Sequence, residues 1–179
     1  MNGKVVGVVL VVSGLIAGGA MYYLQVYGYY HAVEPAGVGD VQVTAIASGK
    51  PEAIRYENFK AIDAESSPLR YRACFDTPMS QAMMTETYQI YGDPVPLVGP
   101  SWFSCYDAKA IGEALEAGGA VAYLGTKNIH WGVDRVVAVT RDGHGYVWQQ
   151  INACGEEVFA GRDAPEGCPP LPQNMVGSE

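Results

Sequence analysis

The feature that most constrains this chain is an uncharged run near its amino terminus. Residues Val5 to Leu24 include no Asp, Glu, Lys or Arg. As an α-helix rising about 1.5 Å per residue, the run would measure about 30 Å, which is the thickness of the hydrocarbon core of a bilayer. A helix of a soluble domain has no reason to be apolar on every face. The run therefore predicts a transmembrane helix.

The residues on either side of this run predict its orientation. Lys4 and the amino terminus precede the run, and no Lys or Arg follows until Lys50. Because positive charge stays on the cytoplasmic side, the amino terminus is expected in the cytoplasm and the rest of the chain outside it. Tyrosines follow on the outer side, where aromatic rings favour the lipid–water interface. They are Tyr22, Tyr23, Tyr27, Tyr29 and Tyr30.

A cleaved signal peptide is the alternative to a retained anchor. Gly18 and Ala20 are small residues of the kind found before a cleavage site. Only one lysine precedes the run, however, and the run is longer than the apolar core of a usual signal peptide. The tyrosine-rich flank is also typical of an interfacial anchor. These features favour a span that is retained.

Small residues occupy one face of the expected helix. Gly14 and Gly18 are four residues apart, and Ala17 lies on the same face. Such a face lets a second helix backbone approach closely, which predicts a dimer or docking to a membrane complex. The alternative is that small residues are simply frequent in membrane helices.

The remaining chain is long enough for one domain. We assign residues 1–30 to a cytoplasmic stub, the helix and its aromatic flank, and residues 31–40 to a linker. Residues 41–179 are expected to form an extracytoplasmic domain with a proline-rich tail. Beyond residue 30 there are ten Lys and Arg against nineteen Asp and Glu, a net charge of −9. Because such a surface repels phosphate backbones, nucleic acid is not expected as a partner.

Periodicity and turn residues predict an α+β domain with a mostly antiparallel sheet and two helices. Asp142-Gly143 is typical of a hairpin turn between two of the strands. A cap at Thr77 would begin the first helix at Pro78, and a cap at Ser104 or Asp107 would begin the second. The expected strands span residues 41–47, 54–61, 69–75, 120–125, 132–140 and 145–151, and the expected helices residues 78–88 and 105–117.

Four cysteines lie in the expected domain, at Cys74, Cys105, Cys154 and Cys168. None belongs to a C-x-x-C pair, and an even number outside the cytoplasm predicts two disulfides. Neighbours in the sequence would pair Cys74 with Cys105 and Cys154 with Cys168, but all three connectivities remain open. Each bond would stabilise the fold by about 3 to 4 kcal/mol in the chain-entropy model.

Cys105 is also the sharpest candidate for catalysis. At a helix start the thiolate form of Cys105 would be favoured, which makes this residue a candidate nucleophile. His130 would be the base, and Asp134 or Asn152 would orient it. This order is that of papain-like hydrolases, but residues 101–106 lack the glycines and the glutamine of that motif. A disulfide would also consume the thiol. We therefore predict no enzymatic activity and keep this triad as an alternative.

Three methionines are a candidate metal site. Met79, Met83 and Met84 carry thioethers, which suit cuprous copper outside the cytoplasm. Methionines on one helical face more often fill a hydrophobic core, and no His or Cys lies at ligand spacing beside these three. We therefore predict no metal and no cofactor.

Two segments carry a resemblance to known sequences, the helix start at Cys105-Tyr-Asp-Ala108 and the strand His130-Trp-Gly-Val-Asp-Arg-Val-Val-Ala-Val139. They resemble an uncharacterised bacterial family of small, amino-terminally anchored proteins, over nearly the whole outer domain. The resemblance implies no activity, because that family has none assigned.

These observations together predict a non-enzymatic protein of the bacterial inner membrane with a periplasmic domain. We expect it to bind or scaffold a protein partner, for example as an accessory subunit of a membrane complex. The alternatives are an extracytoplasmic thiol hydrolase and a small-ligand or copper-binding module.

Overall fold

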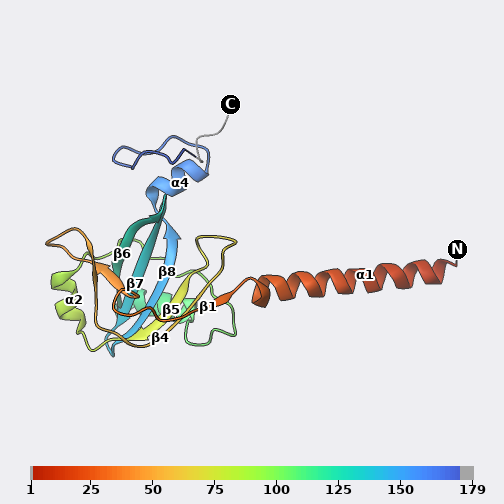
Figure 1. The fold of residues 1–179 in the computed structure, drawn as a ribbon, viewed down its shortest axis with the longest axis horizontal. Coiled ribbons are helices and arrows are strands. Elements are labelled where there is room, and N and C mark those ends of the chain that lie inside the picture. Colours follow the sequence, from red (N-terminus) through yellow and green to blue (C-terminus); the bar gives the residue numbers. More distant parts are fainter. Residues whose placement is uncertain (1, 174–179) are drawn as a thin grey trace.

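A long amino-terminal helix projects from a domain built around a six-stranded antiparallel sheet (Figure 1). The computed structural model describes residues 2–173, so the end of the predicted tail, residues 174–179, lies outside the described residues. The expected α+β class with a mostly antiparallel sheet is confirmed, with three helices after the first rather than two. These helices are α2 (Gln81–Thr87), α3 (Ala108–Glu116) and α4 (Ala153–Phe159).

The predicted span forms the helix α1 (Gly3–Tyr23). It continues into one π-helical turn, η1 (Leu24–Gly28). Together these residues are long and apolar enough to cross a membrane, and none of the residues of α1 is buried against the described part of the chain.

The sheet has the strand order β1-β4-β5-β8-β7-β6, and every neighbouring pair is antiparallel. Residues 31–33 were expected to begin a linker, but they form the edge strand β1, in which Ala32 pairs with Ile62. The chain therefore passes from η1 into the sheet within three residues. The strands of this sheet are β1 (His31–Val33), β4 (Glu57–Asp63), β5 (Arg72–Asp76), β6 (Ala120–His130), β7 (Val133–Thr140) and β8 (His144–Ile151).

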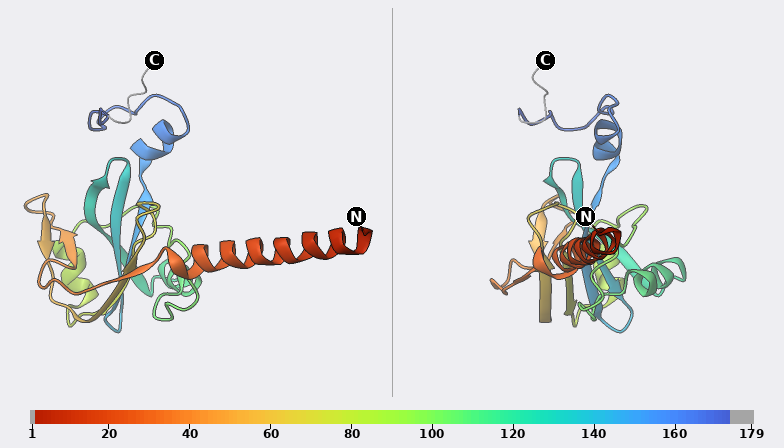
Figure 2. Two further views of the ribbon diagram at one scale, coloured as in Figure 1. Left: turned by 45° about the vertical axis from the view of Figure 1, so that its right-hand side comes forward. Right: turned by 90° about the vertical axis from the view of Figure 1, so that its right-hand side faces the viewer.

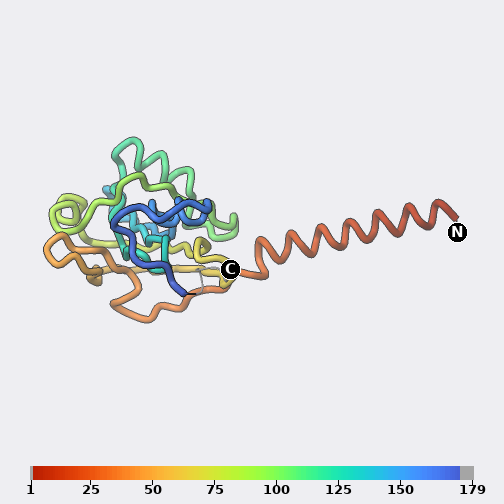
Figure 3. The backbone as a smooth tube through the Cα atoms, turned by 90° about the horizontal axis from the view of Figure 1, so that it is seen from above, coloured from red at the N-terminus to blue at the C-terminus, as the bar shows by residue number. Residues whose placement is uncertain are grey.

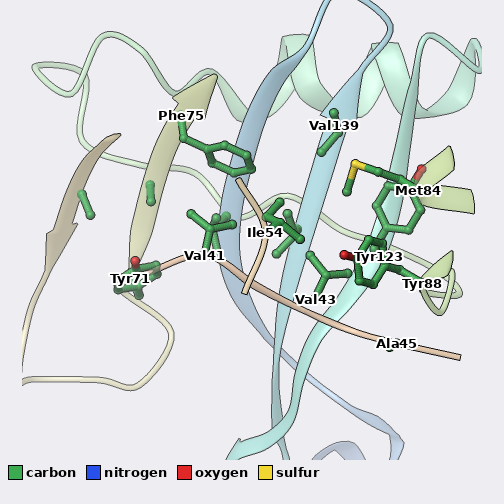
Figure 4. Packing of buried hydrophobic residues seen from close by; sticks show 14 residues of the cluster. Val41, Val43, Ala45, Ile54, Tyr71, Phe75, Met84, Tyr88, Tyr123 and Val139 are labelled. Carbon is green, nitrogen blue, oxygen red and sulfur yellow. The ribbon is translucent and has the colours of Figure 1, made fainter. Parts of the chain in front are cut away.

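One face of the sheet is covered by a small hairpin, β2 (Gln42–Thr44) and β3 (Pro51–Ala53), together with α2. Figure 2, in the view along α1, shows this hairpin in orange on one side of the sheet and α3 in green on the other. Burial of apolar side chains between these layers is the main favourable contribution to folding. Figure 4 shows the first of the two resulting cores, which includes Val41, Val43, Tyr71, Phe75, Met84 and Tyr123.

The second core lies on the opposite face, beneath α3 and the segment that precedes it. Trp148 of β8 belongs to this core and is fully buried. Ile111 from α3 and Phe103 from the preceding loop pack against the same cluster. The segment of residues 91–107 has no helix or strand of its own, so its position depends on this core.

The caps of the two predicted helices agree only in part with expectation. Asp107 caps α3 by accepting from the backbone N–H groups of Lys109 and Ala110, as predicted. The first helix begins later than expected, because its cap is Ser80 and not Thr77. The hydroxyl of Thr77 donates instead to the carbonyl of Arg55.

The hairpin of β7 and β8 is confirmed, with Gly143 at φ 88° in its turn. Gly145 lies against the ring of Phe75, where a Cβ atom would come within 2.1 Å of a ring carbon. No helix was expected after residue 151, but residues Ala153–Phe159 form α4, whose cap Asn152 accepts from the backbone N–H of Gly155.

Candidate functional site

The candidate functional site is the junction where two loops of the domain contact η1. The indole N–H of Trp102 donates to the backbone carbonyl of Val26 at 2.7 Å. The guanidinium of Arg70 donates to the carbonyl of Gln25 at 3.4 Å. Figures 1 and 3 show both loops beside the end of the helix. These bonds satisfy carbonyls in the last turn of the helix, which lack intrahelical partners.

Aromatic rings from the helix and from the domain form one cluster at this junction. Tyr27 stacks on Trp102 with ring centroids 6.3 Å apart, and Tyr30 meets the same indole edge-on at 6.0 Å. Tyr23 stacks on Tyr27 at 5.9 Å. The guanidinium of Arg70 lies 5.5 Å from the centre of the Tyr30 ring. Such contacts stabilise beyond simple burial, so the end of the helix is held in a fixed relation to the domain.

The small-residue face of α1 is unoccupied within the described chain. Gly14, Ala17 and Gly18 are all exposed. A Cβ atom built on Gly14 or Gly18 would meet nothing within 4 Å. The face therefore has room for the close approach of another helix.

Two disulfides join neighbours in the sequence. Cys74 of β5 is bonded to Cys105 in the loop before α3, with Cα atoms 6.2 Å apart. Cys154 of α4 is bonded to Cys168 in the tail, with Cα atoms 5.8 Å apart. The first bond ties the 91–107 segment to the middle of the sheet, and the second ties the tail to α4.

A buried carboxylate lies where β7 and β8 meet α4. Asp134 is 5% exposed. It accepts from the backbone N–H of Asn128 at 2.8 Å and from the side-chain amide of Asn152 at 2.7 Å. The hydroxyl of Tyr91 donates to it at 3.2 Å, and burial together with this carboxylate raises the pKa of that tyrosine.

This carboxylate borders a cleft of about 450 Å³, which is also lined by Lys127 and Glu156. The hydrogen bonds of Asp134 are made within the protein, so its carboxylate is already satisfied. A buried, fully paired carboxylate of this kind positions backbone segments. We therefore assign it the role of holding α4 to the sheet.

A second polar group lies over the first disulfide. A ring nitrogen of His144 (Nδ1) is 2.7 Å from a carboxylate oxygen of Asp76, and the amide of Asn58 donates to the other oxygen at 2.7 Å. These hydrogen bonds, led by that of Asn58, lower the pKa of Asp76. The group lines a cavity of about 300 Å³ together with Lys60 and Tyr146. The sequence carries no sign of this arrangement, because its members come from three separate strands, β4, β5 and β8.

A family model described as a family of unknown function, DUF6446, matches residues 41–169. The chain belongs to DUF6446. No curated protein and no solved structure matches it. The resemblance to an uncharacterised family is thereby confirmed, and the DUF6446 match includes both loops of the junction and all four cysteines.

The DUF6446 region contains Cys105, His130 and Asp134, but the structure does not bring them together as a triad. The sulfur of Cys105 is in a disulfide, and the residue precedes α3 instead of lying in its first turn. His130 ends β6 and lines a different cavity, with Trp131 and Asp63. The alternative of a thiol hydrolase needs a free thiolate beside an imidazole, and this arrangement does not provide one.

The three methionines of the DUF6446 region that were considered as a copper site lie in different environments. Met84 is fully buried in the first core, whereas Met83 is 44% exposed on the outer side of α2. Met79 is partly buried against the core. Among the described residues, no group of three or more His, Cys, Asp or Glu side chains is placed to hold a metal ion. The thioethers therefore do not converge on a common point, as a copper site would require.

Proposed function

We propose that this protein is a non-enzymatic, single-pass protein of the bacterial inner membrane whose periplasmic domain binds or scaffolds a partner as an accessory subunit of a membrane complex. The observation that carries the proposal is the bonded junction between α1 and the domain. The indole of Trp102 and the guanidinium of Arg70 each donate to a carbonyl of η1. A partner that fixes the helix thereby also fixes the domain.

The membrane location and the orientation rest on separate observations. The apolar helix of Gly3–Gly28 is long enough to span a bilayer. Lys4 precedes it, and its far end carries tyrosines without Lys or Arg until Lys50. Two closed disulfides fit an oxidising compartment beyond the membrane. Each of these features favours a periplasmic domain.

The proposed contact with the partner is the face of Gly14, Ala17 and Gly18. Within lipid, helices associate through close packing of small residues, because burial of apolar surface gives no driving force there. This face is exposed along the helix and has space for a second backbone. η1 ends at Gly28 and β1 begins at His31. A helix bound to a partner through this face would therefore also restrict the position of the sheet.

The test is co-purification from membranes in a mild detergent. The double substitution Gly14→Leu and Gly18→Leu fills the small face, and we expect it to remove the partner that co-purifies with the wild-type protein. Gly19→Leu is the control, because it adds the same side chain about 140° from Gly14 and about 100° from Gly18 around the helix. Cross-linking before solubilisation identifies the partner.

Loss of the partner in the double variant, with retention in the control, supports the proposal. Retention of the partner in the double variant would show that the face is merely compatible with lipid. Recovery of the protein in the soluble fraction would overturn the anchor itself.

A further inference from the structure

The loop that carries Trp102 has an unusual composition for a surface segment. The thirteen residues from Pro94 to Tyr106 contain no charged side chain, although Asp93 and Asp107 flank them directly. We call these residues the 94–106 loop. Beyond residue 30 the chain carries nineteen acidic side chains. The loop itself adds no negative charge that an anionic lipid surface would repel.

The 94–106 loop carries exposed apolar side chains, and Trp102 within it lies against the end of α1. Val98 is 82% exposed and Trp102 is 40% exposed. Val95 is also exposed. Figures 1 and 3 show the green loop next to the end of the helix, on the side of the domain that faces along α1 toward the amino terminus.

The backbone of this loop is fixed from the inside. The guanidinium of Arg72, itself buried, donates to the carbonyls of Leu97 at 2.8 Å and Val98 at 3.0 Å. The side chains of Leu97 and Phe103 pack into the second core. The backbone at Val98 is thus fixed by a hydrogen bond to its carbonyl, so the exposure of its side chain does not result from a mobile loop.

We propose that the 94–106 loop is a lipid-contacting surface, in which Val98 and Trp102 enter the interfacial layer of the bilayer around α1. This inference rests on the proposed membrane span. Its main support is that the loop is part of the aromatic cluster at the junction. The indole of Trp102 is hydrogen-bonded to the last turn of the helix and stacks on the ring of Tyr27. Indole and phenol rings favour the depth of the lipid headgroups, where one end is apolar and the other is wet.

Arg70 supports the same assignment from the neighbouring loop. Its guanidinium lies beside Tyr30 and the carbonyl of Gln25. A guanidinium at this level lies within reach of lipid phosphates, for which its planar set of donors is well suited. The domain would then contact the bilayer through the 94–106 loop and the loop of Arg70, in addition to the helix. The end that carries α2 would point away from the bilayer (Figure 1).

The test uses the full-length protein in vesicles of phosphatidylethanolamine and phosphatidylglycerol. Single cysteines are introduced by Val98→Cys, Met83→Cys or Val12→Cys and labelled with an environment-sensitive fluorophore, while the native cysteines remain in their disulfides. Lipids that carry a nitroxide near the headgroup serve as quenchers. Met83 is the exposed control on α2, and Val12 is the control within the helix.

We expect the label at Val98 to show blue-shifted emission and strong quenching by the nitroxide lipids, and the label at Met83 to show neither. If the label at Val98 behaves like that at Met83 while the label at Val12 reports lipid, the inference is overturned and the proposed span stands. If the label at Val12 also reports water, the proposed span fails and the inference fails with it.

Discussion

The indole of Trp102 donates a hydrogen bond to the backbone carbonyl of Val26, which lies 76 residues earlier in the chain. This bond joins the last turn of the apolar helix to a loop that is itself fixed to the sheet by Arg72 and by the disulfide of Cys105. The helix, the loop and the sheet are therefore joined by direct contacts. A partner or a bilayer that held the helix would therefore also orient the domain.

Trp102→Phe should loosen this junction without unfolding the domain. The substitution keeps an aromatic ring beside Tyr27 but removes the donor to Val26, which we expect to cost about 1 kcal/mol locally. Hydrogen exchange of the amides in η1 should become faster in detergent micelles. Trp131→Phe removes an indole donor to Pro169 in the tail and is the control. Unchanged exchange in η1 would contradict the assigned role of this bond.

Removing the disulfides should destabilise the domain unequally. The Cys74–Cys105 bond closes a separation of 31 residues and the Cys154–Cys168 bond one of 14. The chain-entropy model gives about 4 and about 3 kcal/mol respectively. Replacing both cysteines of a pair by Ala and measuring urea unfolding should therefore lower the free energy of unfolding more for the first pair. The reverse order would show that the first loop is held mainly by its core contacts.

Asp134→Ala should destabilise the attachment of α4. It leaves the backbone N–H of Asn128 without its acceptor and removes one of the two acceptors of the Asn152 amide, which costs about 1 to 3 kcal/mol. Asp134→Asn retains one acceptor oxygen and should cost less. The exposed Asp163→Ala is the control. Urea unfolding checks the ranking, and equal midpoints for Asp134→Ala and the control would contradict a structural role.

Stability at acid pH should depend on Asp76. Hydrogen bonds from Asn58 and His144 lower the pKa of this carboxyl below its ordinary value of 3.8. The folded state therefore holds the proton less tightly than the unfolded state. The stabilising contribution is present above the ordinary pKa and is lost as the pH falls through the lower folded value.

Asp76→Asn should accordingly show a weaker loss of stability than the wild-type protein as the pH falls below about 4. Urea midpoints measured over a pH series check this difference. Glu86→Gln, which removes an exposed carboxyl on α2, should follow the wild-type curve. Parallel curves for Asp76→Asn and the wild-type protein would show that the hydrogen-bonded group makes no contribution.

Elements with local signals were predictable from the sequence. The apolar helix, α3 with its Asp107 cap and the β7–β8 hairpin with its Asp142-Gly143 turn each carry their signal within a few residues. α4 was missed because its seven residues are held by tertiary contacts, namely the Cys154–Cys168 bond and the close approach of Gly155 to Gly132. β1 was missed because its partner β4 lies about 30 residues further along the chain.

The candidate site was predictable only on its helical side. The expected span predicts that the tyrosines after Leu24 lie at its outer interface. Two of them, Tyr27 and Tyr30, lie in the junction. Trp102 and Arg70 complete the junction from distant loops, and no spacing in the sequence links them to Val26 or Gln25. The alternative triad of Cys105, His130 and Asp134 is not assembled, because Cys105 is bonded to Cys74 and His130 lines a different cavity.

The most direct test of the account is the topology of single-cysteine variants in intact cells. Asn2→Cys and Val38→Cys are probed with a maleimide that does not cross the inner membrane. We predict that position 38, which is exposed after β1, reacts in intact cells, and that position 2 reacts only after lysis and stays in the membrane pellet. Reaction of position 2 in intact cells, or a soluble protein that has lost it, would contradict an anchored chain with its domain in the periplasm.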